Sequence, residues 1–442
     1  MKTDAQRSVI LGLAALALIS LSGCGSFSLD DYNPFSEREE KLPGVRKPFL
    51  TDANALAVDE SAKAVPALPA AVENGNWSQP GGNSANAPGH LAFAASPKVS
   101  FRVGAVRGSS DELRLSNPPI IYQGRVYVMD TAANVVAFST AGGRAWSVPL
   151  RPEGESEDGI AGGGLAADDG KLFAATGYGI VYALDPASGK QLWNVNLNMP
   201  IRSAPTAAAG KVFVVTSDNR VVALNAGDGA QAWDYRGIQE TTGVLGAASP
   251  AVSGDLVVVP YSSGEITAFK ASSGDPVWAE ALIRSQQFTS VSGISDVAAR
   301  PVIDNGLVYA VSVSGRMVAV DLRTGDRVWQ RNLASSQMPV SAGQTVYVVD
   351  LSGQLVALSR SGGQVRWVTQ LPGGRKVRWN GPVLAGGQLW LTSSEGILAA
   401  VNAISGQITS QTKLGDPTYM APVVAGGRMY VLTDKGGLLG LN

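Results

Sequence analysis

The sequence is poor in the side chains on which most enzyme and metal sites depend. Its 442 residues include one cysteine and one histidine, so neither an intrachain disulfide nor a thiolate metal cluster is possible. The histidine, His90, lies in the polar, turn-rich stretch NAPGHLAF, where we expect an ordinary surface residue. A Ser–His–Asp nucleophile set cannot be assembled around it. The sequence therefore predicts no metal site and no nucleophilic triad.

Charged residues are also scarce, at 16% against roughly 25% in an average globular chain. The formal net charge of −1 provides no basic field for nucleic acid, which we exclude as a partner. No tight pair of carboxylates stands out that could work as acid and base in catalysis. What the sequence has instead is 52 glycines and regular apolar runs, and these predict many short strands joined by tight turns.

The N-terminus has the layout of a secretory signal peptide. Lys2 and Arg7 precede an apolar run over 9–21, and small residues follow in LSGC. The run is shorter than the about 20 residues of a transmembrane helix, and LSGC resembles the bacterial lipobox, in which the cysteine is lipidated. We therefore expect a signal peptide over 1–23 and acylation, palmitate included, at Cys24. The alternative is an ordinary secreted protein with a stray thiol.

The residue after the cysteine bears on the membrane to which the chain is attached. It is Gly25, not the aspartate that typically keeps bacterial lipoproteins in the inner membrane. We expect an anchor in the outer membrane on its periplasmic face, because several acyl chains give lasting attachment. Residues 24–76 are rich in Ala, Pro and Asp without a sustained period, which predicts a flexible tether.

Self-similarity begins after the tether and continues to the end of the chain. A tryptophan recurs every 38 to 51 residues, and a period of about 40–50 is typical of propellers and solenoids. Each unit has a proline-containing opening, two apolar strands, an Asp/Ser/Thr–Gly turn and a strand that carries the tryptophan. Four strands per unit make a propeller blade. The repeated tryptophans are Trp146, Trp193, Trp233, Trp278, Trp329 and Trp367.

Two units depart from the pattern, and together they predict how the ring closes. The unit VNAISGQITSQTKL has Ser410 at the tryptophan position, and the last unit ends after three strands. The stretch SPKVSFRVGAV places Phe101 where a tryptophan would stand, so this N-terminal strand can complete the last blade and remove exposed edges. The predicted fold is all-β: an eight-bladed propeller of four-stranded antiparallel blades over 77–442.

The tryptophans and the turn aspartates also have functional interpretations. A tryptophan stripe can stack on a cofactor, but recurrence at one position in every blade favours a wedge between adjacent blades. Asp-x-x-Ser-Gly segments such as 185–189 can suggest metal loops, but they also have the composition of hairpin turns. We expect structural roles for both sets, without a cofactor.

The repeat resembles that of eight-bladed propellers of the quinoprotein alcohol dehydrogenase type. With the lipobox and this length, the chain resembles the BamB family, lipoproteins of the outer-membrane β-barrel assembly machinery. The quinoprotein enzymes use a quinone, calcium, carboxylate ligands and commonly a disulfide of adjacent cysteines, which one cysteine cannot supply. The resemblance therefore implies a non-enzymatic subunit without a cofactor. The alternatives are a periplasmic quinone- or calcium-dependent dehydrogenase and a propeller that scaffolds cell-envelope enzymes.

Two connections between blades are candidates for binding a partner. Connections from one blade to the next lie on the same face as the turns between the second and third strands. The longest such connection lies between Trp278 and Pro301, and long loops in a rigid array usually carry function. A shorter one, NMPIRSA, has Met199 and Ile201, which we expect to be exposed, beside Arg202, the composition of an interface hot spot. The alternative for Ile201 is that it begins a strand.

The family resemblance implies a partner for these loops. In BamB-like proteins the shorter loop contacts the periplasmic (POTRA) domains of BamA through aliphatic residues and an arginine, which match Met199, Ile201 and Arg202. A second loop contributes acidic residues, and Asp296 matches one of them. Where the family has a further aspartate, this sequence has Ala298, which weakens the acidic part of the match. The resemblance also implies other subunits of the machinery, and unfolded outer-membrane protein clients, as partners.

Overall fold

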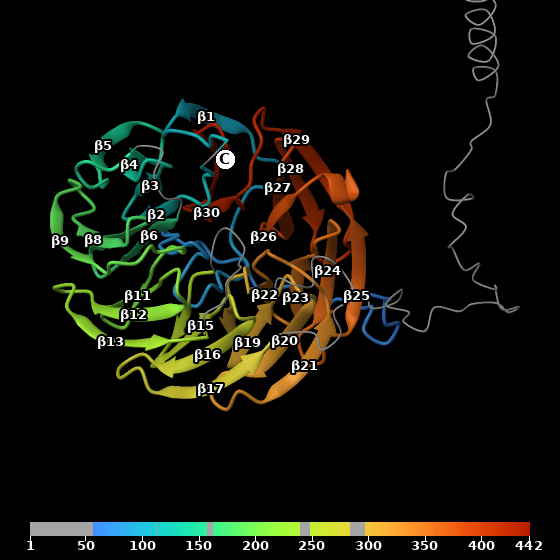
Figure 1. Cartoon of the computed structure of the whole chain (residues 1–442). Helices are drawn as coiled ribbons and strands as arrows, with labels where there is room; N and C mark the ends of the chain where they lie inside the picture. The colour runs from blue at the N-terminus through green and yellow to red at the C-terminus, as the bar shows by residue number, and fades with distance from the viewer. Residues whose placement is uncertain (1–55, 112, 157–161, 239–247, 283–296) are drawn as a thin grey trace, which may run out of the picture. The chain divides into compact units, whose positions relative to one another are not determined.

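The computed structural model describes residues 56–111, 113–156, 162–238, 248–282 and 297–442. Within them, 32 strands form eight antiparallel sheets of four strands each. Figure 1 shows these sheets side by side around a central axis. The predicted all-β, eight-bladed propeller is confirmed.

The blades are numbered 1 to 8 along the chain, and the strands of each are lettered A to D from the axis outward. Blade 1 consists of β2 (Ile120–Tyr122), β3 (Arg125–Met129), β4 (Asn134–Ser139) and β5 (Arg144–Pro149), and blade 2 of β6 (Gly163–Asp168), β7 (Lys171–Thr176), β8 (Ile180–Leu184) and β9 (Gln191–Asn196). Blade 3 consists of β10 (Thr206–Ala208), β11 (Lys211–Val215), β12 (Arg220–Asn225) and β13 (Gln231–Arg236), and blade 4 of β14 (Ala251–Ser253), β15 (Leu256–Pro260), β16 (Glu265–Lys270) and β17 (Pro276–Ala281).

Blades 5 to 8 follow the same order, except that the last strand of blade 8 comes from the N-terminal side of the chain. Blade 5 consists of β18 (Val302–Asp304), β19 (Leu307–Val311), β20 (Arg316–Asp321) and β21 (Arg327–Asn332), and blade 6 of β22 (Val340–Ala342), β23 (Thr345–Val349), β24 (Gln354–Ser359) and β25 (Val365–Gln370). Blade 7 consists of β26 (Trp379–Ala385), β27 (Gln388–Ser393), β28 (Ile397–Asn402) and β29 (Ile408–Lys413), and blade 8 of β30 (Val423–Ala425), β31 (Arg428–Leu432), β32 (Gly437–Leu441) and β1 (Val99–Gly104). A short 3-10 helix, η4 (Gly374–Lys376), precedes β26.

Blade 8 closes the ring as the sequence predicts. Strand β1 pairs antiparallel with β32, with Phe101 opposite Gly440. Lys98 and Asn442 exchange backbone hydrogen bonds of 2.9 and 3.1 Å beyond this pair. Phe101 occupies the register position of the tryptophans in the other blades, because each of those tryptophans is paired with the small residue at the same point of its C strand.

The core lies between the blades rather than in one central cluster. Strands B and C are buried along nearly their whole length, whereas most D strands alternate between exposed and half-buried residues. One hydrophobic cluster, for example, joins Tyr127 and Val135 of blade 1 to Leu165 and Leu172 of blade 2. Both faces of the middle strands must therefore be apolar, since each face packs on a neighbouring sheet.

The six repeated tryptophans contact the next blade, as predicted. Each indole lies against the glycine of the next blade's C–D turn, so closely that a Cβ on that glycine would come within 2.6–2.8 Å of the tryptophan. In five of them the Nε1–H donates to a carbonyl of the next blade, for example from Trp329 to Arg360 over 2.8 Å. The contacted glycines are Gly189, Gly229, Gly274, Gly325, Gly363 and Gly406.

The presence of a serine instead of a tryptophan at position 410 has a structural reason. Ser410 is opposite Ala400 in β28, at the tryptophan register. Its neighbour is blade 8, where strands C and D come from distant parts of the chain and meet through Lys98 and Asn442 instead of a turn. Blade 8 thus has no C–D turn glycine on which an indole could pack.

Two glycines of one turn test this packing. Gly229 has a φ of +77° and its added Cβ would lie 2.7 Å from Trp193, whereas Gly227 in the same turn has open space around it. We expect Gly229→Ala to lower the free energy of unfolding by about 2 kcal/mol through the left-handed backbone and the overlap. Gly227→Ala is the matched control and should change it by less than about 0.5 kcal/mol. Chemical denaturation of both variants measures the difference, and equal effects would contradict the packing.

The N-terminal strap, residues 56–92, corrects the predicted end of the tether. The sequence predicts a flexible tether as far as residue 76, but residues 56–76 lie against the propeller. Asp59 N–H donates to Val365 O over 2.9 Å, Arg366 Nη1 donates to Ala62 O over 2.9 Å, and Leu68 packs on the cluster between blades 6 and 7. Low hydrophobicity did not prevent ordering, because the contacts are mainly hydrogen bonds to blade edges.

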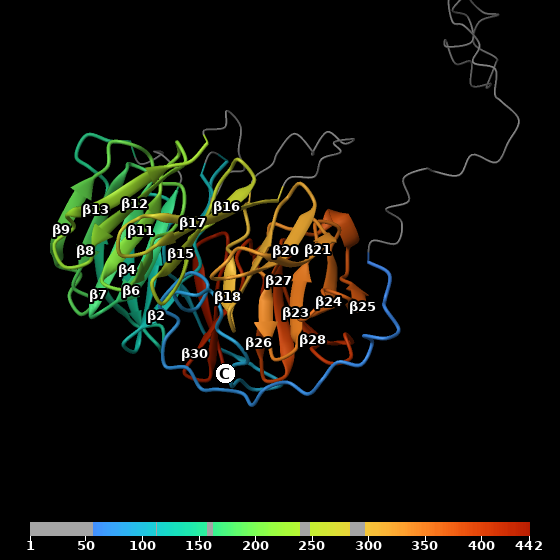
Figure 2. The same cartoon turned by 90° about the horizontal axis from the view of Figure 1, so that it is seen from below.

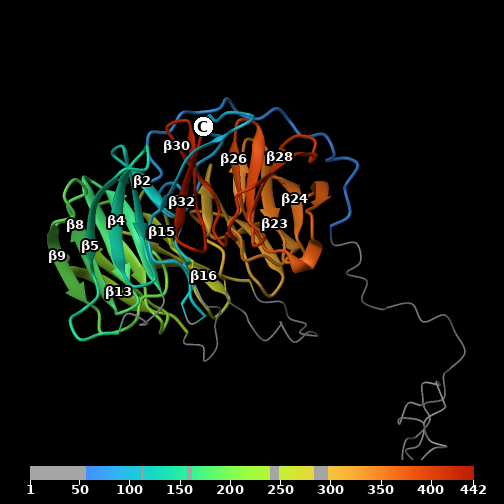
Figure 3. The same cartoon turned by 90° about the horizontal axis from the view of Figure 1, so that it is seen from above.

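The strap supplies partners to the innermost strands, whose edges would otherwise be unpaired. Figures 2 and 3 show it in blue along one face of the ring. Trp77 pairs with Ile121 of blade 1, and Ser84 O accepts from Val252 N of blade 4 over 2.7 Å. The buried Gln79 side chain donates to Ala207 O over 2.8 Å and accepts from its N–H over 3.2 Å.

His90 is a structural residue of this strap, not the ordinary surface residue that we expected. The ring is half-buried, its Nε2 accepts the N–H of Gly387 over 2.9 Å, and its Nδ1 lies 2.7 Å from Pro69 O. A neutral imidazole with the proton on Nδ1 satisfies both contacts. His90 thereby connects two parts of the strap to blade 7.

Candidate partner-docking surface

The connection 197–204 links β9 of blade 2 to β10 of blade 3 and is held by turns from both blades. Leu197 N donates to Gly179 O over 2.8 Å, and Ser217 N donates to Pro200 O over 2.8 Å. Gly179 and Ser217 belong to B–C turns. The structure thus confirms that this blade-to-blade connection lies on the same face as the B–C turns, which we call the loop face.

Ile201 is fully buried, so the expectation that its side chain is exposed is wrong. It forms an isolated antiparallel bridge with Thr216 and packs with Val212 and Val214 between blades 2 and 3. The alternative interpretation, that Ile201 begins a strand, is also not met, because the bridge with Thr216 is isolated and β10 begins only at Thr206. An aliphatic residue before a strand serves the core and an interface equally well, so composition alone could not distinguish them.

Met199 and Arg202 are half-buried on either side of Ile201. The backbone of Met199 lies close to Gly179, where an added Cβ would come within 2.6 Å of Met199 O. Arg202 N donates to Val215 O over 3.4 Å. The backbone of the loop is therefore fixed at three successive points, which limits the entropy that a partner must remove on binding.

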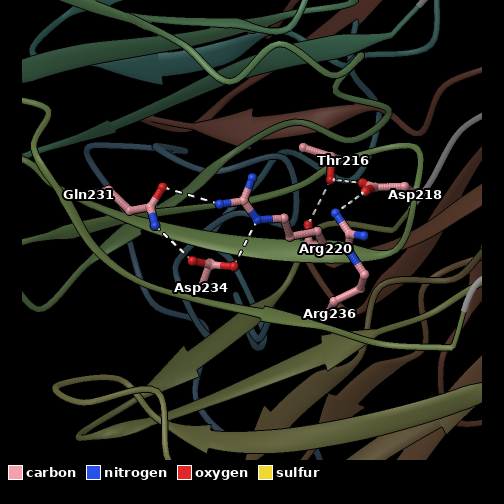
Figure 4. Close-up of polar contacts among 6 residues, drawn as sticks. All are labelled: Thr216, Asp218, Arg220, Gln231, Asp234 and Arg236. Carbon is pink, nitrogen blue, oxygen red and sulfur yellow. Dashed lines mark hydrogen bonds and ion pairs between the residues drawn. The ribbon is translucent and has the colours of Figure 1, made fainter.

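A polar network braces the neighbouring B–C turn of blade 3 (Figure 4). Thr216 Oγ1 donates to Asp218 Oδ1 over 2.5 Å, and Arg236 Nη2 lies 3.0 Å from Asp218 Oδ2. On the outer strands, Arg220 Nε donates to Asp234 Oδ2 over 2.8 Å, which holds the pKa of the Asp234 carboxyl below its usual range. Because the backbone of Thr216 also pairs with Ile201, the network supports the 197–204 loop through this turn.

An apolar area that the sequence analysis missed adjoins this network. Tyr235, Ile238 and Val277 are 39%, 61% and 41% exposed and line a surface pocket of about 420 Å³ between β13 and β17, together with Arg236. Arg236 belongs to both the pocket and the network. The available signal was an aromatic residue at position 235 and an isoleucine two residues after the end of a D strand.

Two predicted site residues, Cys24 and Asp296, lie outside the described residues. Ala298 is half-buried and lines a second cavity of about 560 Å³ near the axis, which we call the axial cavity. The described end of the connection between Trp278 and Pro301 thus lies near the axis of the ring.

The resemblance to quinoprotein enzymes implies a cofactor and calcium near the axis, so the axial cavity is the place to test whether the residues suit them. Its described lining includes Arg114, Arg300 and Arg378 but no aspartate or glutamate. No cluster of three metal-ligating side chains occurs in the described ranges. Calcium takes about 6–8 oxygen ligands, carboxylates prominent among them, so the described residues of this cavity do not suit a calcium–quinone pair. Among the same residues, no helix is long and apolar enough to span a membrane.

The closed ring of eight four-stranded blades, six of them wedged on the next through a tryptophan and a turn glycine, defines an eight-bladed β-propeller with repeats of the quinoprotein type. A quinohemoprotein alcohol dehydrogenase from Pseudomonas putida HK5 has the same fold, with a TM-score of 0.65 at 15% identity over 85% of this chain and 83% of that one. The crystal structure of BamB from Moraxella catarrhalis is also similar, with a TM-score of 0.68 at 21% identity over 78% of this chain and 100% of that one.

The sequence comparisons distinguish between these relatives. The family model described as "Outer membrane protein assembly factor BamB" matches residues 131–369 and 370–442. The protein of that name from Salmonella typhimurium is 31% identical over 326 residues, which are 72% of this chain and 82% of the relative. The chain belongs to the BamB family of outer-membrane protein assembly factors.

Proposed function

We propose that this chain is a non-enzymatic subunit of the outer-membrane β-barrel assembly machinery that docks on the periplasmic domains of BamA. Its family membership supports a role in assembly. The docking site is the loop face at blades 2 and 3, with Met199 as the apolar contact and Arg202 as the polar one. Ile201 contributes by fixing the loop from within the core.

The observation that carries this proposal is the backbone support of Met199 and Arg202. Hydrogen bonds at Leu197, Pro200 and Arg202 hold the loop against two B–C turns, and an ion pair between Asp218 and Arg236 stiffens one of those turns. A rigid loop with an apolar residue and an arginine side by side has the composition of an interface hot spot. The exposed Tyr235 and Ile238 extend the same surface outward.

The rest of the proposal concerns attachment and action. The signal peptide and Cys24 would place an acylated chain on the periplasmic face of the outer membrane, with residues 24–55 as the tether. From there the propeller would position BamA, and other subunits of the machinery, to receive unfolded outer-membrane proteins and assist their insertion. The axial cavity, which lacks carboxylates among its described residues, supports a role without quinone chemistry.

The test is binding of the full chain, in detergent, to the purified periplasmic part of BamA by titration calorimetry. We expect saturable binding, and we expect Met199→Asp to weaken it about tenfold or more because a charge would enter an apolar contact. Val328→Asp, at an exposed position on the outer strand of blade 5, is the control and should bind normally. Absence of binding at every salt concentration would refute docking on BamA.

A further inference from the structure

The axial cavity is built from parts of the chain that lie far apart in the sequence. Trp77 and Pro80 of the strap line it together with the connections that lead into blades 1, 5, 6, 7 and 8. Apolar side chains, among them Leu115, Met338 and Val383, make up much of the wall. Its volume of about 560 Å³ lies within the roughly 300–1,000 Å³ of small-molecule sites.

All charged side chains in the described lining of the axial cavity are positive. Three arginines, Arg114, Arg300 and Arg378, line it, and the described lining contains no acidic residue. Arg114 has an ion pair with Asp434 at 3.5 Å and a largely exposed side chain. Arg378 is exposed. The two of them lie at positions where solvent screens their charge.

Arg300 differs from the other two because it is half-buried and has no ion-pair partner among the described residues. Its Nε is shielded from solvent and has no hydrogen-bond acceptor among the described residues. Burial lowers the pKa of Arg300 to about 10, so the guanidinium is still charged at neutral pH. A half-buried cation with a shielded, unsatisfied Nε–H and no counter-charge among the described residues is costly to a fold and needs an explanation.

A second buried donor on the same cavity also has no acceptor. Trp77 is 1% exposed, it lines the cavity, and its Nε1–H has no hydrogen-bond acceptor in the described part of the chain. The cavity therefore combines a cation and an indole N–H, both short of acceptors, with an apolar wall.

We propose that the axial cavity binds a small organic anion, with its carboxylate or phosphate group on Arg300 and its apolar part against Leu115, Met338 and Val383. An oxyanion supplies the acceptors that the guanidinium and the indole N–H lack, and charge-assisted hydrogen bonds of this kind are stronger than neutral ones. The site goes beyond docking on BamA and does not depend on it, since it uses none of the residues of the 197–204 loop.

The first experiment compares three probes with the same aromatic body on the full chain. Phenylacetate carries a carboxylate, phenyl phosphate carries a phosphate, and phenylethanol is neutral. We expect saturable calorimetric binding of at least one anion at millimolar concentration, an increase in Tm with that anion, and at least about tenfold weaker binding of phenylethanol. The anion that binds more tightly identifies the acid group. Equal binding of all three probes, or of none, overturns the proposal.

Substitution then tests the role of Arg300. Arg300→Met should weaken binding of the anion about tenfold or more and abolish its effect on Tm, while the unliganded protein unfolds at an equal or higher temperature because an unpaired, half-buried charge is gone. Arg323→Gln, at an exposed turn position, should bind like the original chain. If Arg300→Met does not fold, Trp77→Phe removes the second donor and should weaken binding severalfold. Unchanged affinity in a folded Arg300→Met variant overturns the assignment.

Discussion

Trp329→Ala is expected to lower the free energy of unfolding by about 3–5 kcal/mol, as for other buried aromatic residues. The indole is 6% exposed and lies between blades 5 and 6. Its removal opens a cavity against Gly363, loses the tilted ring contact with Tyr309 at 6.1 Å between ring centroids, and leaves the carbonyl of Arg360 without its donor at 2.8 Å. Three losses thus act at one boundary between blades.

Equilibrium denaturation with urea measures this change, and Val328→Ala is its control. Val328 is the preceding residue of β21 and is 47% exposed, so its truncation removes little buried surface. We expect Val328→Ala to cost less than about 1 kcal/mol. A loss below about 1 kcal/mol for Trp329→Ala would contradict the wedge, because the cavity and the lost hydrogen bond together require more.

Arg202→Glu should weaken docking on the periplasmic domains of BamA by about 2–4 kcal/mol, the size of a hot-spot loss. The substitution replaces a cation by an anion on a loop whose backbone is fixed at Leu197, Pro200 and Arg202. Since these bonds are made by the backbone, the loop should keep its conformation. Titration calorimetry gives the affinity, and thermal unfolding of the free protein reports on folding.

The control for charge is Arg323→Glu, which makes the same change at an exposed C–D turn position. C–D turns belong to the face opposite the loop face, so this variant should dock with unchanged affinity. A fall in Tm of Arg202→Glu that matches its loss of affinity would show that Arg202 supports the fold instead of the contact. Equal weakening by both variants would indicate a general effect of net charge.

The partner surface could be predicted from the sequence only in part. Its location on a blade-to-blade connection follows from the repeat, because strand order dictates which ends share a face. The burial of the Ile201 side chain could not be predicted from the repeat, because it depends on a single backbone pairing with Thr216. Tyr235 and Ile238 were missed for the converse reason: both are residue types typical of a core, yet they remain 39% and 61% exposed beside blade 4.

The sequence by itself determined the propeller, its eight blades, the closure by Phe101 and its strand, and the packing role of the tryptophans. These features follow from two short-range patterns, the alternation of apolar residues and the placement of turn glycines. Because both patterns recur in almost every blade, each repeat confirms the others. Only the tertiary structure decided that the strap is ordered, that Gln79 pairs with Ala207, and that Arg300 and Trp77 share a cavity. Such contacts join single residues across long stretches of chain, mostly through backbone carbonyls and N–H groups that every residue carries. No local pattern distinguishes them until the ring has closed.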